Sequence, residues 1–132
     1  MSLRDLPWKN LHFIGIGGVG MTGLALICRD LGVTVRGSDK VASKNVDLLR
    51  GRGAEVAVGH DAAHVQSPDL VVYSSAVDSD NPEYAAAVAR GLPLLLRGEF
   101  LAVLAPYWPT VVSIAGSHGK TTVTAMLAHI LL

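Results

Sequence analysis

Short apolar runs alternate along the chain with longer stretches in which apolar residues recur every three or four positions. The short runs have the length of buried strands, and most of them are followed by glycine or serine. The longer stretches have the spacing of helices that bury one face. The pattern predicts strands at 11–16, 33–37, 55–58, 69–73 and 92–96, and helices at 19–31, 46–52, 82–90 and 98–105.

Turn and cap residues support several of these boundaries. Asn81 is suited to cap a helix, Pro82 to occupy its first position, and Glu83 to interact favourably with the helix dipole. Gly32 fits the end of the helix at 19–31. Because strands and helices alternate, we predict an α/β, Rossmann-like domain over residues 1–105, with a parallel sheet and helices on both faces.

The alternation breaks after residue 105, where Pro106 and Pro109 enclose two aromatic residues. A further apolar run at 110–115 predicts a strand, and 121–132 predicts a helix that stops with the chain. We therefore predict a linker and an incomplete second domain, a truncated strand–P-loop–helix, over residues 106–132. We expect this apolar tail to pack on its own domain or to mediate self-association.

Composition excludes several classes of function. Half of the 132 residues are hydrophobic and the formal net charge is zero, which argues against a nucleic-acid or membrane-surface partner. No apolar run is long enough to span a bilayer, and the N-terminus does not resemble a signal peptide. The single cysteine, Cys28, lies in a helical pattern and is expected to be buried. We expect a cytoplasmic protein in a reducing compartment.

The first glycine-rich motif, G-x-G-x-x-G at 15–20, follows a predicted strand and opens a predicted helix. Gly15 permits the tight turn, Gly17 lets a diphosphate approach the backbone, and Gly20 lets the helix pack close to the strand. Asp39 ends the second strand and could accept hydrogen bonds from ribose hydroxyls. The motif indicates a nucleotide diphosphate without selecting among NAD, FAD and a nucleotide sugar. The alternatives are glycines that serve packing alone and a solvated Asp39.

The second glycine-rich motif, at 116–122, also joins a predicted strand to a predicted helix. It has the form G-x-x-G-K-T-T, with Ile114 in place of the outer glycine of the full P-loop. Lys120 would reach the β- and γ-phosphates of ATP, and Thr121 would coordinate Mg²⁺. His118 could contact substrate, adjust local charge or lie on an exposed turn. The predicted ATP-binding residues are Gly116, Ser117, His118, Gly119, Lys120, Thr121 and Thr122.

Together, the two loops and the segments between them resemble the Mur ligases of peptidoglycan synthesis. The resemblance rests on residues 12–21, 37–39, 74–77, 97–101 and 115–122, in the family's order and spacing. It covers nearly the whole chain, and the last motif is highly specific to this group. Gly98 lies where the family more often has a larger residue.

The resemblance implies an ATP-dependent, amide-forming ligase with separate domains for the UDP substrate, ATP and the amino acid. ATP would phosphorylate the carboxylate of UDP-N-acetylmuramic acid, and the amino group of L-alanine would attack the acyl phosphate. The first loop would then bind the UDP diphosphate rather than NAD. The nearest alternative is a ligase that attaches a preformed peptide to the same UDP sugar.

The resemblance also implies roles for individual residues. We predict Lys120 and His118 as catalytic residues and Thr121 as the Mg²⁺ ligand. Ser38 and Asp39 would lie near the uridine, and 74–76 would line the same crevice unless they form an ordinary turn. The predicted UDP-substrate-binding residues are Gly15, Gly17, Gly18, Val19, Gly20, Ser38, Asp39, Ser74, Ser75 and Ala76.

Other polar residues carry weaker predictions. His60 could face the nucleotide, although a surface turn fits it better, and His64 and His129 have no partner in the sequence. Arg97 and Glu99 would support the junction toward the ATP domain or form a solvated pair.

Because only ten residues follow Thr122, we expect a fragment that binds the UDP substrate without catalysing ligation. Two other function classes remain open at this point. One is a nicotinamide-nucleotide-binding domain that uses only the first loop, and the other is a regulatory nucleotide-binding module without a reaction.

Overall fold

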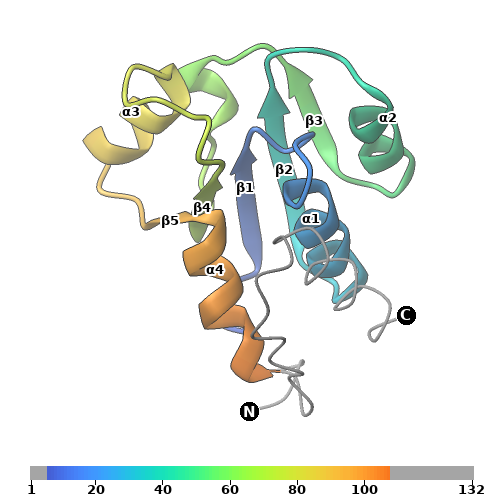
Figure 1. Cartoon of the computed structure of the whole chain (residues 1–132). Helices are drawn as coiled ribbons and strands as arrows, with labels where there is room; N and C mark the ends of the chain where they lie inside the picture. The colour runs from blue at the N-terminus through green and yellow to red at the C-terminus, as the bar shows by residue number, and fades with distance from the viewer. Residues whose placement is uncertain (1–5, 108–132) are drawn as a thin grey trace, which may run out of the picture.

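Five parallel strands form the centre of the molecule (Figure 1). The computed structural model describes residues 6–107. The strands are β1 (Asn10–Ile14), β2 (Thr34–Asp39), β3 (Glu55–Val58), β4 (Leu70–Tyr73) and β5 (Leu94–Leu96), and their order in the sheet is β3-β2-β1-β4-β5. The predicted Rossmann-like parallel sheet is confirmed. The predicted strand, P-loop and helix after residue 109, and the self-association predicted for them, lie outside the described residues.

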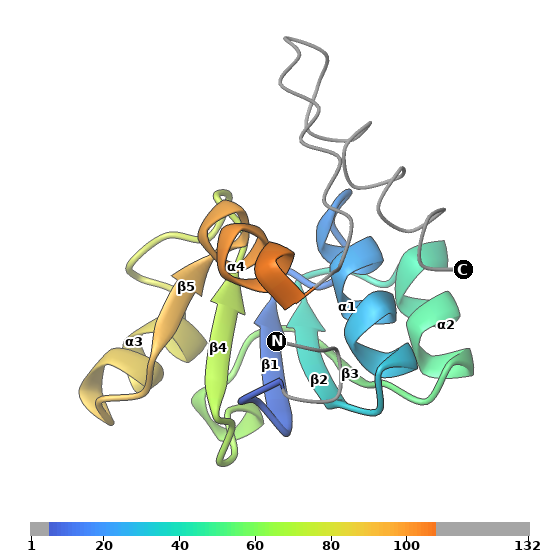
Figure 2. The ribbon, with the colours of Figure 1, turned by 90° about the horizontal axis from the view of Figure 1, so that it is seen from below.

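Helices cover both faces of the sheet, as predicted. They are α1 (Met21–Asp30), α2 (Lys44–Gly51), α3 (Pro82–Ala89) and α4 (Arg97–Leu104), with short 3₁₀ turns η2 (Ala62–His64) and η3 (Ala105–Tyr107). Figure 2 shows α1, α2 and α4 on one face and α3 on the other, where η2 packs against α3. None of the helices within residues 6–107 combines the length and apolar character that crossing a bilayer requires.

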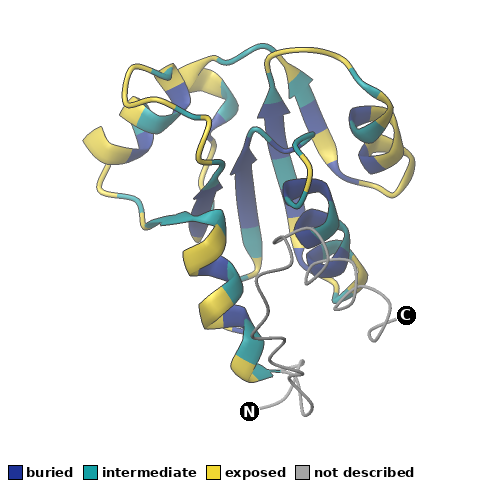
Figure 3. Cartoon of the chain, viewed as in Figure 1, coloured by how far each residue is buried: buried dark blue, intermediate teal, exposed yellow. Residues whose placement is uncertain are grey.

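The alternation of side chains along the strands divides the core into two apolar clusters. Leu11 and Phe13 of β1 belong to the larger cluster, together with Phe100 of α4. Ile14 faces the opposite way and belongs to the smaller cluster, with Ala87 of α3. Figure 3 shows the buried strand β1 and the buried inner side of α1. Because β1 is covered on both faces, its apolar residues point to both sides of the sheet, and His12 is a buried polar residue among them.

Caps and turns explain where the observed elements differ from the predicted ones. The first strand ends before Gly15, because that residue has a φ of 81° and begins a turn. Helix α2 begins two residues earlier than predicted, because the Ser43 hydroxyl accepts the Val46 N–H at 3.2 Å. The predicted cap of α3 is confirmed, since the Asn81 side chain accepts the Glu83 N–H at 2.9 Å.

The order in which successive strands are added to the sheet changes direction at β1. Strands β2 and β4 pair with β1 on its two sides, so the first half of the domain extends one way and the second half the other. In open parallel sheets, ligands bind outside the carboxyl ends of the strands at such a point. The glycine motif at 15–20, Asp39 at the end of β2 and residues 74–76 after β4 all lie at this edge.

Gly37 of β2 lies so close to β1 that no side chain fits. A Cβ atom at this position would lie 2.6 Å from the Phe13 carbonyl oxygen and 2.7 Å from Ile16 Cδ1. The strands cannot separate without losing the ladder that pairs Phe13 with Gly37. We expect Gly37→Ala to lower the free energy of unfolding by roughly 2 kcal/mol or more, measured by urea denaturation.

The matched control is Gly51→Ala in α2. A Cβ atom at Gly51 would meet no described atom within 4 Å. Because alanine is the better helix former, we expect this variant to gain up to about 1 kcal/mol. Equal stability in the two variants would contradict the packing argument.

Candidate functional site

The glycine motif after β1 forms a closed turn that is fixed to the end of β2. The Gly15 and Ile16 N–H groups both donate to the Ser38 carbonyl oxygen, at 2.8 and 3.0 Å, and the Gly18 N–H donates to the Gly15 carbonyl at 3.1 Å. Gly15 and Gly20 have φ angles of 81° and 83°, which L side chains rarely adopt. These two glycines are therefore required by the backbone of the loop.

Asp39 contacts the loop directly. Its Oδ2 atom accepts the Gly17 N–H at 2.8 Å, and a Cβ atom on Gly17 would lie 2.9 Å from the same oxygen. The side chain of Asn45 donates to the Gly17 carbonyl at 2.9 Å, a contact that the sequence did not indicate. The structure thus places Asp39 beside the second glycine of the motif. Its contact with a ribose stays a prediction.

The open side of the loop presents backbone N–H groups. Within residues 6–107, the N–H groups of Val19, Gly20 and Met21 have no hydrogen-bond partner. They lie at the N-terminus of α1, where the helix dipole adds partial positive charge. Val19 itself is 73% exposed. Unpaired N–H groups at an accessible helix N-terminus are suited to bind an anion such as a phosphate.

Arg97 places a cation at the same point. A Cβ atom on Gly20 would lie 3.0 Å from Arg97 Nη1, so the guanidinium lies against the third glycine of the motif. Arg97 is the first residue of α4, where a positive charge opposes the helix dipole. Among the described residues no carboxylate forms an ion pair with it. An anion at the loop would relieve both unfavourable features.

Arg97 and Glu99 do not form an ion pair with each other. Glu99 Oε1 accepts the Leu96 N–H at 2.9 Å and thereby caps its own helix. The structure places the Arg97 side chain over the glycine loop, and its support of a junction toward the ATP domain stays a prediction. Only the tertiary structure could show the contact with the loop, because Arg97 and Gly20 are far apart in the sequence.

The turn after β4 packs against the first glycine of the loop. Ser74 Oγ accepts the Ala76 N–H at 3.2 Å, and the Ser74 carbonyl accepts the Val77 N–H at 3.0 Å. A Cβ atom on Gly15 would lie 3.2 Å from Ser74 Cβ. Ser75 and Ala76 are exposed at the same edge of the sheet. The structure therefore brings together the predicted residues of all three segments, and their contact with UDP stays a prediction.

Ser38 occupies a different environment from the one its predicted role suggests. Its side chain is fully buried, and its hydroxyl donates to Glu83 Oε1 at 2.8 Å. The hydroxyl therefore points beneath the loop, while the backbone carbonyl holds the loop. Direct contact between Ser38 and a nucleotide stays a prediction.

Glu83 is the centre of a buried hydrogen-bonded cluster, which we call the Glu83 cluster. It comprises Glu83, Ser38, His12, His60 and His64. The nearest histidine nitrogens lie 2.5 Å (His12 Nε2), 3.2 Å (His60 Nδ1) and 3.1 Å (His64 Nδ1) from the carboxylate oxygens. The expectation that His64 lacks a partner was therefore wrong.

The sequence did not reveal the Glu83 cluster. Glu83 was expected only to favour the helix dipole, but its side chain is fully buried. One polar signal was present, because His12 interrupts the apolar run of β1. Burial alone would raise the pKa of the Glu83 carboxyl, but hydrogen bonds from His12, Ser38 and His64 outweigh burial and lower the pKa to about 2.

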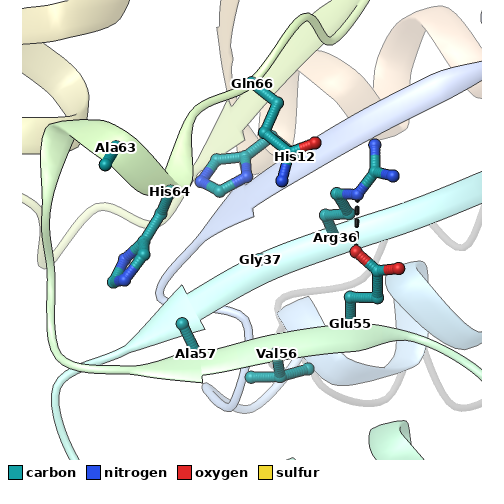
Figure 4. Close-up of a pocket in the computed structure, with 9 residues that line it drawn as sticks. All are labelled: His12, Arg36, Gly37, Glu55, Val56, Ala57, Ala63, His64 and Gln66. Carbon is teal, nitrogen blue, oxygen red and sulfur yellow. Dashed lines mark hydrogen bonds and ion pairs between the residues drawn. The ribbon is translucent and has the colours of Figure 1, made fainter.

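A cavity of about 230 Å³ lies beside this cluster, and His12 and His64 form part of its lining (Figure 4). Arg36 and Glu55 face it and form an ion pair with a distance of 2.7 Å between Nε and Oε2. None of the motif glycines at 15–20 lines this cavity. Because its arginine is already paired, the cavity lacks the free positive charge found at the glycine loop. It is lined by His12, Arg36, Gly37, Glu55, Val56, Ala57, Ala63, His64 and Gln66.

Two further predictions concern reactive groups. Cys28 is buried, and burial raises the pKa of its thiol to about 12, so the predicted apolar role is confirmed and a nucleophilic role is excluded.

Within residues 6–107, no group of histidine, cysteine or acidic residues is arranged to hold a metal ion. The predicted ATP-binding, catalytic and Mg²⁺-binding residues at 116–122 lie outside the described residues, as does His129.

The Glu83 carboxyl is expected to make stability fall in acid. Its pKa is about 2 in the folded chain and 4.5 ordinarily, so the unfolded chain binds more protons between these values. The stabilisation is full above about pH 4.5 and is lost as the pH falls toward 2. We expect a decrease in the free energy of unfolding on the order of 3 kcal/mol over this range, measured by urea denaturation.

Two variants separate Glu83 from the other acidic groups. Glu83→Gln should remove this part of the pH dependence. Asp69→Asn should retain it, although the N–H groups of Lys9 and Asn10 also lower the pKa of Asp69. If Glu83→Gln and the unmodified chain lose stability equally between pH 4.5 and 2, Glu83 does not carry the effect.

Comparison with known proteins gives a consistent family. The family described as "Mur ligase family, catalytic domain" matches residues 10–108. The chain is 50% identical over 130 residues to the UDP-N-acetylmuramate–L-alanine ligase of Caulobacter sp. (strain K31), covering 97% of this chain and 27% of that protein. It is 47% identical over 124 residues to the same ligase of Aquifex aeolicus, covering 94% and 27%. The chain thus spans about a quarter of the length of these relatives.

Solved structures agree with this assignment. The UDP-N-acetylmuramate–alanine ligase of Thermotoga maritima superposes with a TM-score of 0.78 at 38% identity, covering 94% of this chain and 29% of that one. A murein peptide ligase of Psychrobacter arcticus superposes with a TM-score of 0.76 at 37% identity, covering 93% and 26%.

Proposed function

The chain belongs to the Mur ligase family, and we propose that it supplies the UDP-sugar-binding part of an ATP-dependent ligase that joins L-alanine to UDP-N-acetylmuramic acid. The acceptor amino acid and the UDP sugar are taken from the names of curated relatives that are 46–50% identical. Residues 1–105 form the UDP-sugar domain in this proposal, and residues 106–132 are the linker and the beginning of the ATP domain.

The observation that carries the proposal is the arrangement of positive groups at the glycine loop. The unpaired N–H groups of Val19, Gly20 and Met21 and the guanidinium of Arg97 lie at one accessible point. A diphosphate carries the charge and the acceptor oxygens that such groups bind. The two ends of the UDP sugar would extend from there toward Asp39 on one side and residues 74–76 on the other.

The second loop would act on the other substrate. We infer that residues 116–122 hold the phosphates of ATP, with Lys120 on the β- and γ-phosphates and Thr121 on Mg²⁺. In the proposed reaction, the muramic acid carboxylate attacks the γ-phosphorus of ATP and ADP leaves. The amino group of L-alanine then attacks the acyl phosphate, phosphate leaves, and an amide forms.

A second candidate function lies within the same family. The murein peptide ligase of Psychrobacter arcticus and the tripeptide ligase of Neisseria meningitides superpose with TM-scores of 0.76 and 0.75. This chain could therefore belong to a ligase that transfers a preformed peptide to the same UDP sugar. The solved structures of the two kinds of ligase are almost equally similar, at 38% and 37% identity, and the curated L-alanine ligases at 46–50% identity favour the first candidate.

Titration calorimetry on the full chain tests the proposed ligand. We expect UDP-N-acetylmuramic acid to bind and NADH to give no heat, because the relatives act on the UDP sugar. Binding of NADH in preference to the UDP sugar would favour a nicotinamide-nucleotide-binding domain. The absence of heat with either ligand at millimolar concentration would contradict the proposal.

The role of Arg97 gives a separate prediction. We expect Arg97→Ala to weaken binding of UDP-N-acetylmuramic acid by about tenfold to a hundredfold, because a charge-assisted contact with the diphosphate is lost. Arg52→Ala is the control, since Arg52 lies at the surface in an ion pair with Asp30. Equal affinities of the two variants in calorimetry would remove Arg97 from the site.

A further inference from the structure

We propose that Glu83 is a positioning residue for the UDP-sugar site, acting through Ser38 to hold the glycine loop in its anion-binding shape. This inference rests on the proposed function, because it assigns the support of the same loop. Glu83 lies beneath the loop and is fully buried, so it has no direct access to a ligand bound at Val19 and Gly20.

Ser38 connects the Glu83 cluster to the loop through two different groups. Its hydroxyl donates to Glu83 at 2.8 Å, and its backbone carbonyl accepts the N–H groups of Gly15 and Ile16. The next residue, Asp39, accepts the Gly17 N–H. A shift of Ser38 would therefore move three of the hydrogen bonds that shape the loop.

The carboxylate of Glu83 is itself fixed from several directions. Oε1 faces His12 on β1 and the Ser38 hydroxyl on β2. Oε2 faces His60 and His64, and it accepts the Asp61 N–H at 3.2 Å. These partners come from two strands and from the segment that contains η2, so rotation of the carboxylate would break bonds to separate elements.

The hydrogen bonds that stabilise the charged form of Glu83 over its protonated form do not explain why a carboxyl group, rather than an apolar side chain, occupies this position. A buried carboxylate loses its hydration, and replacement of buried ionic groups by well-packed apolar ones often leaves a protein equally stable. A glutamate in the first turn of α3 could favour the helix dipole from the surface without this cost. The buried position instead gives Ser38 a directional acceptor, and the Ser38 carbonyl is where the loop is attached.

The test measures the loop without ligand and the affinity with ligand. In the full chain, NMR hydrogen exchange of the Gly15 and Ile16 amides reports the bonds to Ser38, and the amide of the buried residue Cys28 in α1 is the internal reference. Calorimetry gives the affinity for UDP-N-acetylmuramic acid. The variants are Glu83→Leu, which leaves no acceptor for the Ser38 hydroxyl, Ser38→Ala and the double variant, with Glu55→Leu as a surface control.

We expect Glu83→Leu and Ser38→Ala each to raise exchange at Gly15 and Ile16 by about tenfold relative to Cys28, and to weaken binding by about tenfold. At Gly15 and Ile16 the double variant should match the single variants, because both changes break the Ser38–Glu83 hydrogen bond, which is the bond that links the carboxylate to the loop. The second contact of the Ser38 hydroxyl, with His60 Nδ1 at 3.0 Å, does not reach the loop. Additive losses in the double variant, or unchanged exchange at the two glycine-loop amides, would overturn the proposal.

The hydrogen-exchange measurement and the calorimetry separate this inference from the proposed function. If the unmodified chain does not bind the UDP sugar, the exchange measurement still decides whether Glu83 holds the loop. If Glu83→Leu does not fold, Ser38→Ala alone must show the faster exchange, because it removes the hydroxyl and keeps the carbonyl. Unchanged exchange in Ser38→Ala would then refute the connection.

Discussion

The contact between the Ser38 carbonyl and the turn after β1 is the constraint on which the candidate site depends. Parallel pairing places the end of β2 beside the end of β1, and the Ser38 carbonyl there accepts two successive N–H groups of the loop. Those bonds fix the turn in which Gly15 has a positive φ. Once the turn is fixed, the N-terminus of α1 points its unpaired N–H groups outward.

Opposite charges are kept apart around this contact. Above the loop, Arg97 and the α1 N-terminus provide positive charge at an accessible point. Below it, the negative charge of Glu83 is enclosed by hydrogen-bond donors. The buried carboxylate thus has its own partners, which leaves the exposed positive groups available for an anion from solvent. In the proposed ligase that anion is the diphosphate of the UDP sugar.

Local sequence patterns predicted most of the fold. The apolar runs correspond to the five strands, and the Asn81 cap of α3 is observed as expected. The glycine spacing and Asp39 indicated the loop and its neighbour, because those positions follow one strand each. The residues that the sequence did not connect to the site have distant partners. Arg97, Asn45 and His12 act on partners distant in the sequence, so no local spacing could link them to the loop or to Glu83.

The sequence by itself determined the strand and helix succession, the two glycine motifs and the family, since these depend on side-chain periodicity and on residues close together in the chain. The tertiary structure decided which polar groups face the loop and which are buried beneath it. Those outcomes depend on sheet order, which sets β4, α3 and α4 around β1. From the sequence alone, a charged residue could be solvated, paired with another residue or available to a ligand. The neighbouring groups decide which of these holds, and only the packing of the chain shows what those neighbours are.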